Sequence, residues 1–157
     1  MLVERHRRKI YQLCYRFVGN HEDASDLTQD VFVRAYRALG GFKGRSAVAT
    51  WLYRIGVNVC LNRVSVKAPR VEAIDVLDRV AGAGEPPDQT LMRQETARRV
   101  RHAIARLPPK QRATLILRTY QELPHEDIAG ILGSSVGAVK ANFFHALANL
   151  RKLLNEP

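Results

Sequence analysis

The sequence predicts an all-α protein made of two small helical modules joined by a flexible linker. Apolar residues recur at spacings of three and four, and no useful length of chain alternates as a strand would. A helix cannot run through the AGAGEPP stretch, because it combines two glycines with two prolines. Charge divides at the same place, with 12 basic against 5 acidic side chains in residues 1–67, 3 against 5 in 68–93, and 10 against 5 in 94–157.

Each module contains its own set of amphipathic stretches. In the first module the apolar spacing predicts helices over 2–18, 23–39 and 47–65. In the second it predicts helices over 94–106, 109–120, 125–132 and 136–154. We place the start of the helix at 125 directly after Pro124, because proline is tolerated at the start of a helix. Each module has about 65 residues, close to the lower limit for independent folding. Because two small modules are joined by a flexible linker, we expect no single relative orientation of the two.

Composition indicates a nucleic-acid partner. The 157-residue chain has a formal net charge of +10, a pI near 10.2 and 46% hydrophobic residues, which suits a folded protein that binds a polyanion. Cys14 and Cys60 have no metal-ligand spacing and are too few for a disulfide scaffold. Apolar runs are short and the N-terminus lacks a secretory core, so we expect a cytoplasmic protein in a reducing setting, without membrane insertion.

The stretch from 125 to 154 predicts a helix-turn-helix. Ala129 is small enough for two helices to approach, Gly133 follows four residues later where the chain must reverse, and Val139 comes six residues after that to fill the angle. The second helix would then enter the major groove with its first two turns. Base or phosphate contacts are expected from its exposed side chains and from Arg118 at the end of the preceding helix; the candidates on the second helix are Lys140, Asn142, Phe144 and His145.

An acidic helix face stands out in the otherwise basic first module. Asp23, Asp26 and Asp30 lie at i, i+3 and i+7, with Gln29 close beside them. The helix dipole explains a carboxylate at Asp23, but it explains Asp30 hardly at all. An acidic face does not approach DNA, so solvent, a metal or a basic protein surface remains. Metal is the weakest of these, because no second helix supplies ligands with suitable spacing.

The helix predicted at 47–65 has a polar face suited to exposed bases. Arg54, Asn58 and Asn62 line this face, with Trp51 and Tyr53 near it. Amides four residues apart, beside arginine and aromatic rings, can hydrogen-bond and stack on single-stranded bases. The alternative is that Trp51 belongs to the core and the asparagines are solvated.

Taken together, the chain resembles the extracytoplasmic-function (ECF) sigma factors of bacterial RNA polymerase. The segment DASDLTQDVFVRAYRAL resembles their polymerase-binding segment, and FKGRSAVATWLYRIGVNVCLN resembles the segment that melts and reads the minus-ten element. LPPKQRATLILR with the helix-turn-helix resembles the module that reads the minus-thirty-five element. The resemblance implies region 2 in residues 1–67, a linker in 68–93 and region 4 in 94–157.

The resemblance also implies roles for particular residues. Asp26, Gln29 and Asp30 would contact the clamp helices of the polymerase's largest subunit. Phe42 and Lys43 would lie in the loop that captures a flipped-out base, which Asn58 helps to hold. The upstream element would be engaged by Arg118, Lys140, Ala141, Asn142, Phe144 and His145. Ala141, Asn142 and His145 differ from the residues common in the family, so the upstream base preference is not carried over.

Such a protein would need no cofactor or metal and would have no enzymatic activity of its own. Its partners would be core RNA polymerase, promoter DNA and an anti-sigma protein. Two other hypotheses remain. A stand-alone helix-turn-helix regulator would leave the acidic face unexplained. A helical metal-dependent phosphohydrolase would use Asp23, Asp26 and Asp30, but it lacks a second ligand set.

Overall fold

The computed structural model describes residues 2–42, 44, 47–72 and 87–156, and every regular element among them is helical. This confirms the all-α prediction. The first module contains α1 (Leu2–Val18), α2 (His21–Ala38), the 3-10 turn η1 (Leu39–Gly41) and α3 (Val48–Val66). The second contains α4 (Pro87–Ala105), α5 (Pro109–Leu115), the π-helical turn η3 (Ile116–Tyr120), α6 (His125–Leu132) and α7 (Val136–Leu154). In the part of the chain that is described, no helix is long and apolar enough to cross a membrane.

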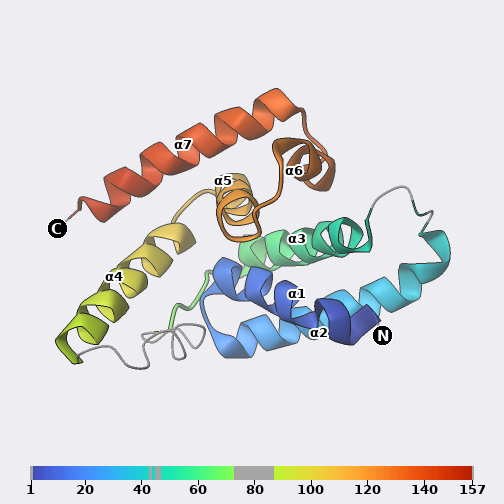
Figure 1. Ribbon diagram of the computed structural model, residues 1–157, viewed down its shortest axis with the longest axis horizontal. Coiled ribbons are helices and arrows are strands. Elements are labelled where there is room, and N and C mark those ends of the chain that lie inside the picture. Colours follow the sequence, from blue (N-terminus) through green and yellow to red (C-terminus); the bar gives the residue numbers. More distant parts are fainter. Residues whose placement is uncertain (1, 43, 45–46, 73–86, 157) are drawn as a thin grey trace.

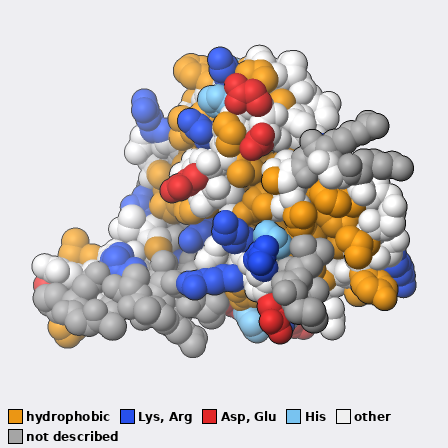
Figure 2. All heavy atoms as spheres, turned by 45° about the vertical axis from the view of Figure 1, so that its right-hand side comes forward, with side chains coloured by type: hydrophobic (Ala, Val, Ile, Leu, Met, Phe, Trp, Pro, Cys, Tyr) orange, Lys and Arg blue, Asp and Glu red, His pale blue; other side chains and the backbone are white. Residues whose placement is uncertain are grey.

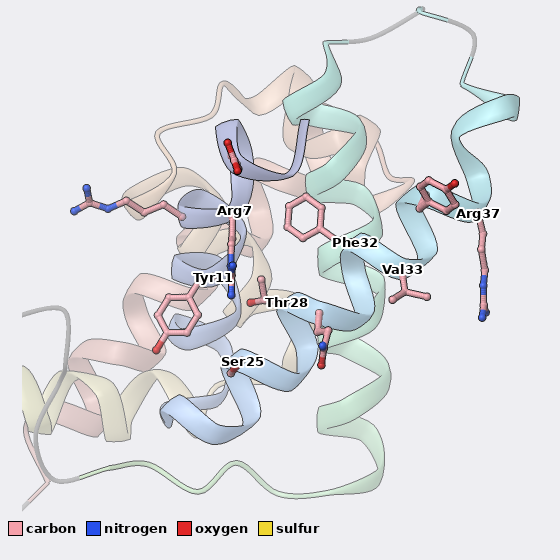
Figure 3. Close-up of a pocket in the computed structure, with 11 residues that line it drawn as sticks. Arg7, Tyr11, Ser25, Thr28, Phe32, Val33 and Arg37 are labelled. Atoms are coloured by element: carbon pink, nitrogen blue, oxygen red, sulfur yellow. The ribbon is translucent and has the colours of Figure 1, made fainter. Parts of the chain in front are cut away.

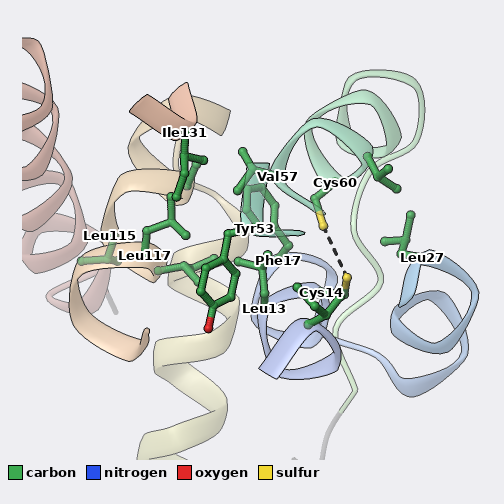
Figure 4. Packing of buried hydrophobic residues seen from close by; sticks show 14 of the residues in the cluster. Leu13, Cys14, Phe17, Leu27, Tyr53, Val57, Cys60, Leu115, Leu117 and Ile131 are labelled. Atoms are coloured by element: carbon green, nitrogen blue, oxygen red, sulfur yellow. Dashed lines mark hydrogen bonds between the residues drawn. The ribbon is translucent and has the colours of Figure 1, made fainter. Parts of the chain in front are cut away.

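Helix α3 occupies the centre of the molecule, between α1 and α2 on one side and α5 and α6 on the other (Figure 1). Gly56 allows the close approach to α1, because a Cβ atom there would lie 3.0 Å from Leu13 Cδ2. The buried side chains of both modules form one continuous apolar cluster, in which Tyr53 and Val57 of α3 lie among residues of both modules (Figure 4). The core therefore does not divide at the module boundary.

The second module packs against the first, which differs from our expectation of two modules without a fixed relative orientation. The Tyr53 hydroxyl donates a hydrogen bond to Oε1 of Gln121 over 2.9 Å, and the Arg16 guanidinium lies 4.2 Å from the ring centroid of Tyr120. The physical reason is that α3 is apolar on two sides, so α1 and α2 alone leave part of it uncovered.

Arg112 joins the two modules through backbone carbonyls. Its side chain is buried, and its two terminal nitrogens donate to the carbonyls of Phe17 (3.4 Å), Ala105 (2.7 Å) and Leu107 (3.0 Å). These carbonyls lie at the C-terminal ends of α1 and α4, where the helix dipole favours a cation. Burial lowers the pKa of Arg112, so the guanidinium depends on these acceptors in place of water.

The predicted linker, residues 68–93, is partly ordered at both ends. At its start Glu72 accepts hydrogen bonds from the Tyr15 hydroxyl (3.0 Å) and the His21 backbone N–H (2.8 Å). At its end α4 begins at Pro87, seven residues earlier than we predicted, because proline is tolerated in a first helical turn. The glycines and the first proline of AGAGEPP lie outside the described residues.

The start of α2 is held by a buried polar group. The Asn20 side chain accepts from the Asp23 backbone N–H (2.9 Å) and donates to the Asp23 carboxylate (2.9 Å) and the Arg70 carbonyl (2.7 Å). The hydrogen bond from Asn20, and the nearby guanidinium of Arg63, lower the pKa of Asp23. Asp23 is therefore a structural residue at a helix start.

Replacing Asn20 by alanine is expected to lower the free energy of unfolding by about 1–2 kcal/mol, because a buried helix cap and two further hydrogen bonds are lost. Chemical denaturation monitored by circular dichroism measures this. The control is Asn62→Ala on the exposed face of α3, expected to change stability by about 0.5 kcal/mol or less. Equal effects of the two substitutions would contradict the capping role.

Cys14 and Cys60 face each other in the core, with 3.8 Å between their sulfur atoms. The contact with Cys14 and full burial raise the pKa of the Cys60 thiol well above its ordinary value. Since the thiolate is the reactive form, we expect both thiols to resist alkylation by iodoacetamide at pH 7.5 in the folded protein and to react fully in denaturant. Mass spectrometry checks this; rapid modification of the folded chain would contradict the packing.

Candidate functional site

The acidic face of α2 is smaller than the sequence indicated. Asp26 and Gln29 are exposed, and Asp30 is half-buried and pairs with Arg34 over 3.1 Å. Asp23 is separated from them by its buried hydrogen bonds with Asn20. No three His, Cys, Asp or Glu side chains in the described ranges are grouped so that they could hold a metal ion. The described residues therefore offer no ligand set for the phosphohydrolase hypothesis.

A groove between α1 and α2 adjoins this face, and sequence reasoning missed it. Its volume is about 850 Å³, and Gln29 lines it together with Phe32, Val33 and Tyr36 of α2 (Figure 3). Tyr36 is 82% exposed, which is unusual for a large aromatic side chain in a helix. The signal available in the sequence was the occurrence of three large apolar residues, Phe32, Val33 and Tyr36, close together in this helix. Arg7, Arg8 and Arg37 also line the groove. Figure 2 shows hydrophobic side chains gathered on the side of the molecule where α2 ends in Figure 1.

The polar face predicted on α3 is present and open to solvent. Arg54, Asn58 and Asn62 are all exposed, at intervals of four residues along one side of the helix. Phe42 is half-buried and packs on Trp51, with ring centroids 4.9 Å apart. Trp51 thus borders both the core cluster and the loop before α3. Lys43, the other loop candidate, lies outside the described residues.

The helix-turn-helix forms as predicted from its three marker residues. Ala129 is 8% exposed between α6 and α7, Gly133 takes the left-handed conformation with φ 64°, and Val139 is fully buried. Ser135 caps α7, since its hydroxyl accepts from the Ala138 backbone N–H over 3.0 Å. These features fix the angle at which α7 leaves the turn.

The candidate DNA-reading residues on α7 are mostly accessible. Lys140, Ala141, Phe144 and His145 are exposed, and Asn142 is half-buried. Phe144 is 69% exposed. Its neighbour in sequence, Phe143, is the phenylalanine that packs against the core. Away from this helix, Arg118 is exposed and donates to the Leu123 carbonyl over 3.0 Å, which places it at the turn before α6.

Two family models match the chain in the order of its modules. Sigma-70 region 2 matches residues 2–69, and Sigma-70, region 4 matches residues 97–150. The gap between the matches contains most of the predicted linker. The first match covers α1 to α3. The second covers the later part of α4, all of α5, η3 and α6, and most of α7.

Characterised relatives resemble almost the whole chain. The RNA polymerase sigma-H factor of Pseudomonas aeruginosa is 36% identical, over 98% of this chain and 84% of its own length. The ECF RNA polymerase sigma factor SigW of Bacillus subtilis is 32% identical, over 99% of this chain and 88% of its own. The ECF RNA polymerase sigma-E factor of Escherichia coli is 34% identical, over 93% of this chain and 81% of its own.

Solved structures share the fold. The sigma factor RpoE in complex with the anti-sigma factor NepR from Bartonella quintana aligns with a TM-score of 0.74 at 21% identity, over 97% of this chain and 93% of that one. CnrH in complex with the cytosolic domain of CnrY aligns with a TM-score of 0.70 at 27% identity, over 98% and 85%. With both regions present in order and relatives above 30% identity over nearly its full length, this chain belongs to the ECF sigma factors of bacterial RNA polymerase.

Proposed function

We propose that this chain binds core RNA polymerase through α2 and directs it to promoters that its two modules read. The observation that supports this best is the separation of three exposed surfaces on three helices: the acidic face of α2, the polar face of α3 and the first turns of α7. A regulator that binds duplex DNA alone would use only the third. The chemistry of transcription would belong to the polymerase, in the cytoplasm, and the chain would bind and position without a catalytic site.

The polymerase would dock on Asp26, Gln29 and Asp30. Gln29 belongs both to this face and to the groove between α1 and α2, so the contact surface combines carboxylates with a cleft that apolar side chains and arginines line together. A partner helix that sets basic side chains against Asp26 and Asp30 and apolar side chains into the cleft fits this chemistry. RpoE and CnrH were each solved with a second protein, an anti-sigma factor in the case of RpoE, and we propose a partner of that kind for this chain.

The first module would hold the melted strand at the minus-ten element. Phe42 and Trp51 form an aromatic pair at the start of α3, next to the loop that contains Lys43. A base leaving the duplex can stack on such a pair, while Asn58 and Asn62 offer amides for hydrogen bonds and Arg54 offers a cation for the backbone.

The second module would read the minus-thirty-five element as a duplex. Lys140 can contact guanine or phosphate, and Asn142 and His145 can contact base edges from the same two turns of α7. Phe144, exposed beside the small Ala141, can lie against a thymine methyl group. Arg118 would contact the DNA backbone, since it lies at the turn before α6.

Asp26→Arg is expected to weaken binding to core polymerase by at least about tenfold, because it places a cation against a basic partner. Co-elution of the chain with sigma-free core polymerase measures this. The matched control is Glu95→Arg on the exposed side of α4, which should bind as the wild type does. Binding by Asp26→Arg at wild-type strength, with its helicity unchanged, would exclude this face as the docking site.

Asn58→Ala is expected to leave polymerase binding unchanged and to reduce open promoter complexes by about fivefold, the loss of roughly one hydrogen bond to a base. Permanganate footprinting measures the melted bases. Ser65→Ala, near the exposed end of the same helix, is the control. If Asn58→Ala weakened polymerase binding and melting equally, its role would be structural.

A further inference from the structure

The groove between α1 and α2 combines guanidinium groups with aromatic rings. Arg7 and Arg8 line it from consecutive positions on α1. Phe32 and Tyr36 line it from α2, four residues apart and therefore on one side of that helix. In Figure 3, Phe32 lies between Arg7 and Arg37. A ligand in the groove would meet cationic and aromatic side chains together.

The positive charge of the groove is largely uncompensated. Three exposed arginines line it, and none of them forms an ion pair or a hydrogen bond with another of the described residues: Arg7, Arg8 and Arg37. By contrast, Arg34 of the same helix α2 pairs with Asp30 over 3.1 Å. Among the described lining residues Glu4 is the only carboxylate, so three cations face one anion. An anionic ligand complements such a lining.

The groove has the size and the chemistry of a nucleotide site. Its volume of about 850 Å³ falls within the range of roughly 300–1,000 Å³ that is usual for small-molecule sites. Two adjacent guanidinium groups offer several N–H donors at one place, which suits the oxygens of a phosphate chain. Exposed aromatic rings such as that of Tyr36 offer a flat face on which a base can stack.

We propose that this groove binds a nucleotide with two or more phosphates, and that the bound nucleotide competes with core RNA polymerase. Arg7 and Arg8 hold the phosphates, and Phe32 and Tyr36 contact the base. Glu4 can accept a hydrogen bond from an amino group of the base. The competition rests on the proposed function, whereas the nucleotide site stands on the groove alone.

Competition follows from the space that the two ligands share. Gln29 belongs both to the proposed docking face and to the groove. The partner helix of the polymerase would place apolar side chains into the same cleft that a nucleotide would fill. A nucleotide present at ten times its dissociation constant would therefore raise the apparent dissociation constant for polymerase by about tenfold.

Isothermal titration calorimetry of the whole chain with ADP, adenosine and pyrophosphate tests the site. We expect ADP to bind at least about tenfold more tightly than either of the others, because each of those lacks one half of the interaction. Pyrophosphate that binds as tightly as ADP would refute the nucleotide assignment. Binding of a helical peptide with glutamates flanking leucines, in the absence of ADP binding, would assign the groove to an acidic protein segment instead.

Arg8→Gln and Arg5→Gln form a matched pair of variants. Both arginines are exposed on α1, and only Arg8 lines the groove. Arg8→Gln is expected to weaken ADP binding by about tenfold and Arg5→Gln by less than about twofold. Equal effects would mean that ADP is attracted by the net charge of the chain and would exclude a site. Tyr36→Leu is expected to weaken ADP binding by about fivefold and to leave pyrophosphate binding unchanged.

Co-elution with sigma-free core polymerase, with and without ADP at ten times its dissociation constant, tests the competition. Polymerase binding is expected to fall by about tenfold in the wild type and by only about twofold in Arg8→Gln. This difference separates ADP in the groove from ADP bound to the polymerase. Polymerase binding that ADP leaves unchanged would overturn the competition. A chain that fails to co-elute without ADP would overturn the proposed function, while calorimetry still decides the nucleotide site.

Discussion

The structure depends on one helix that must be covered on nearly every side. Around α3 the buried positions include Leu52, Tyr53, Gly56 and Val57, which point in more than one direction from the helix axis. Helices α1 and α2 cover the side that contains Gly56, and α5 and α6 cover the side nearer Tyr53. Exposure of an apolar helix surface to water is unfavourable, so the second module packs on α3 and thereby against the first module.

The same constraint leaves one face of α3 open to solvent. Once both apolar sides are covered, one strip remains exposed, and it contains Arg54, Asn58 and Asn62. The residues that we propose to read bases are thus held on a helix whose backbone is fixed by packing, which is how a side chain keeps the geometry that base recognition needs. Stability and recognition use different faces of one element.

Sequence reasoning located most helices to within two residues, because their boundaries are marked by apolar spacing and by residues such as Gly133. It also found the exposed row on α3. It missed the contact between the modules, since it placed Tyr53 near the polar face of α3. Arg112 and Glu72 escaped for another reason: their partners include backbone groups far away in sequence, and no residue type marks those.

Arg112 lies where the two modules meet, but most of its hydrogen bonds are made within its own module. Two of its acceptors, Ala105 and Leu107, belong to its own module, and only Phe17 belongs to the other. Separation of the modules would cost the longest of the three bonds, 3.4 Å, while the two shorter ones persist. The attraction between the modules therefore comes mainly from the apolar cluster, to which Arg112 adds one long hydrogen bond.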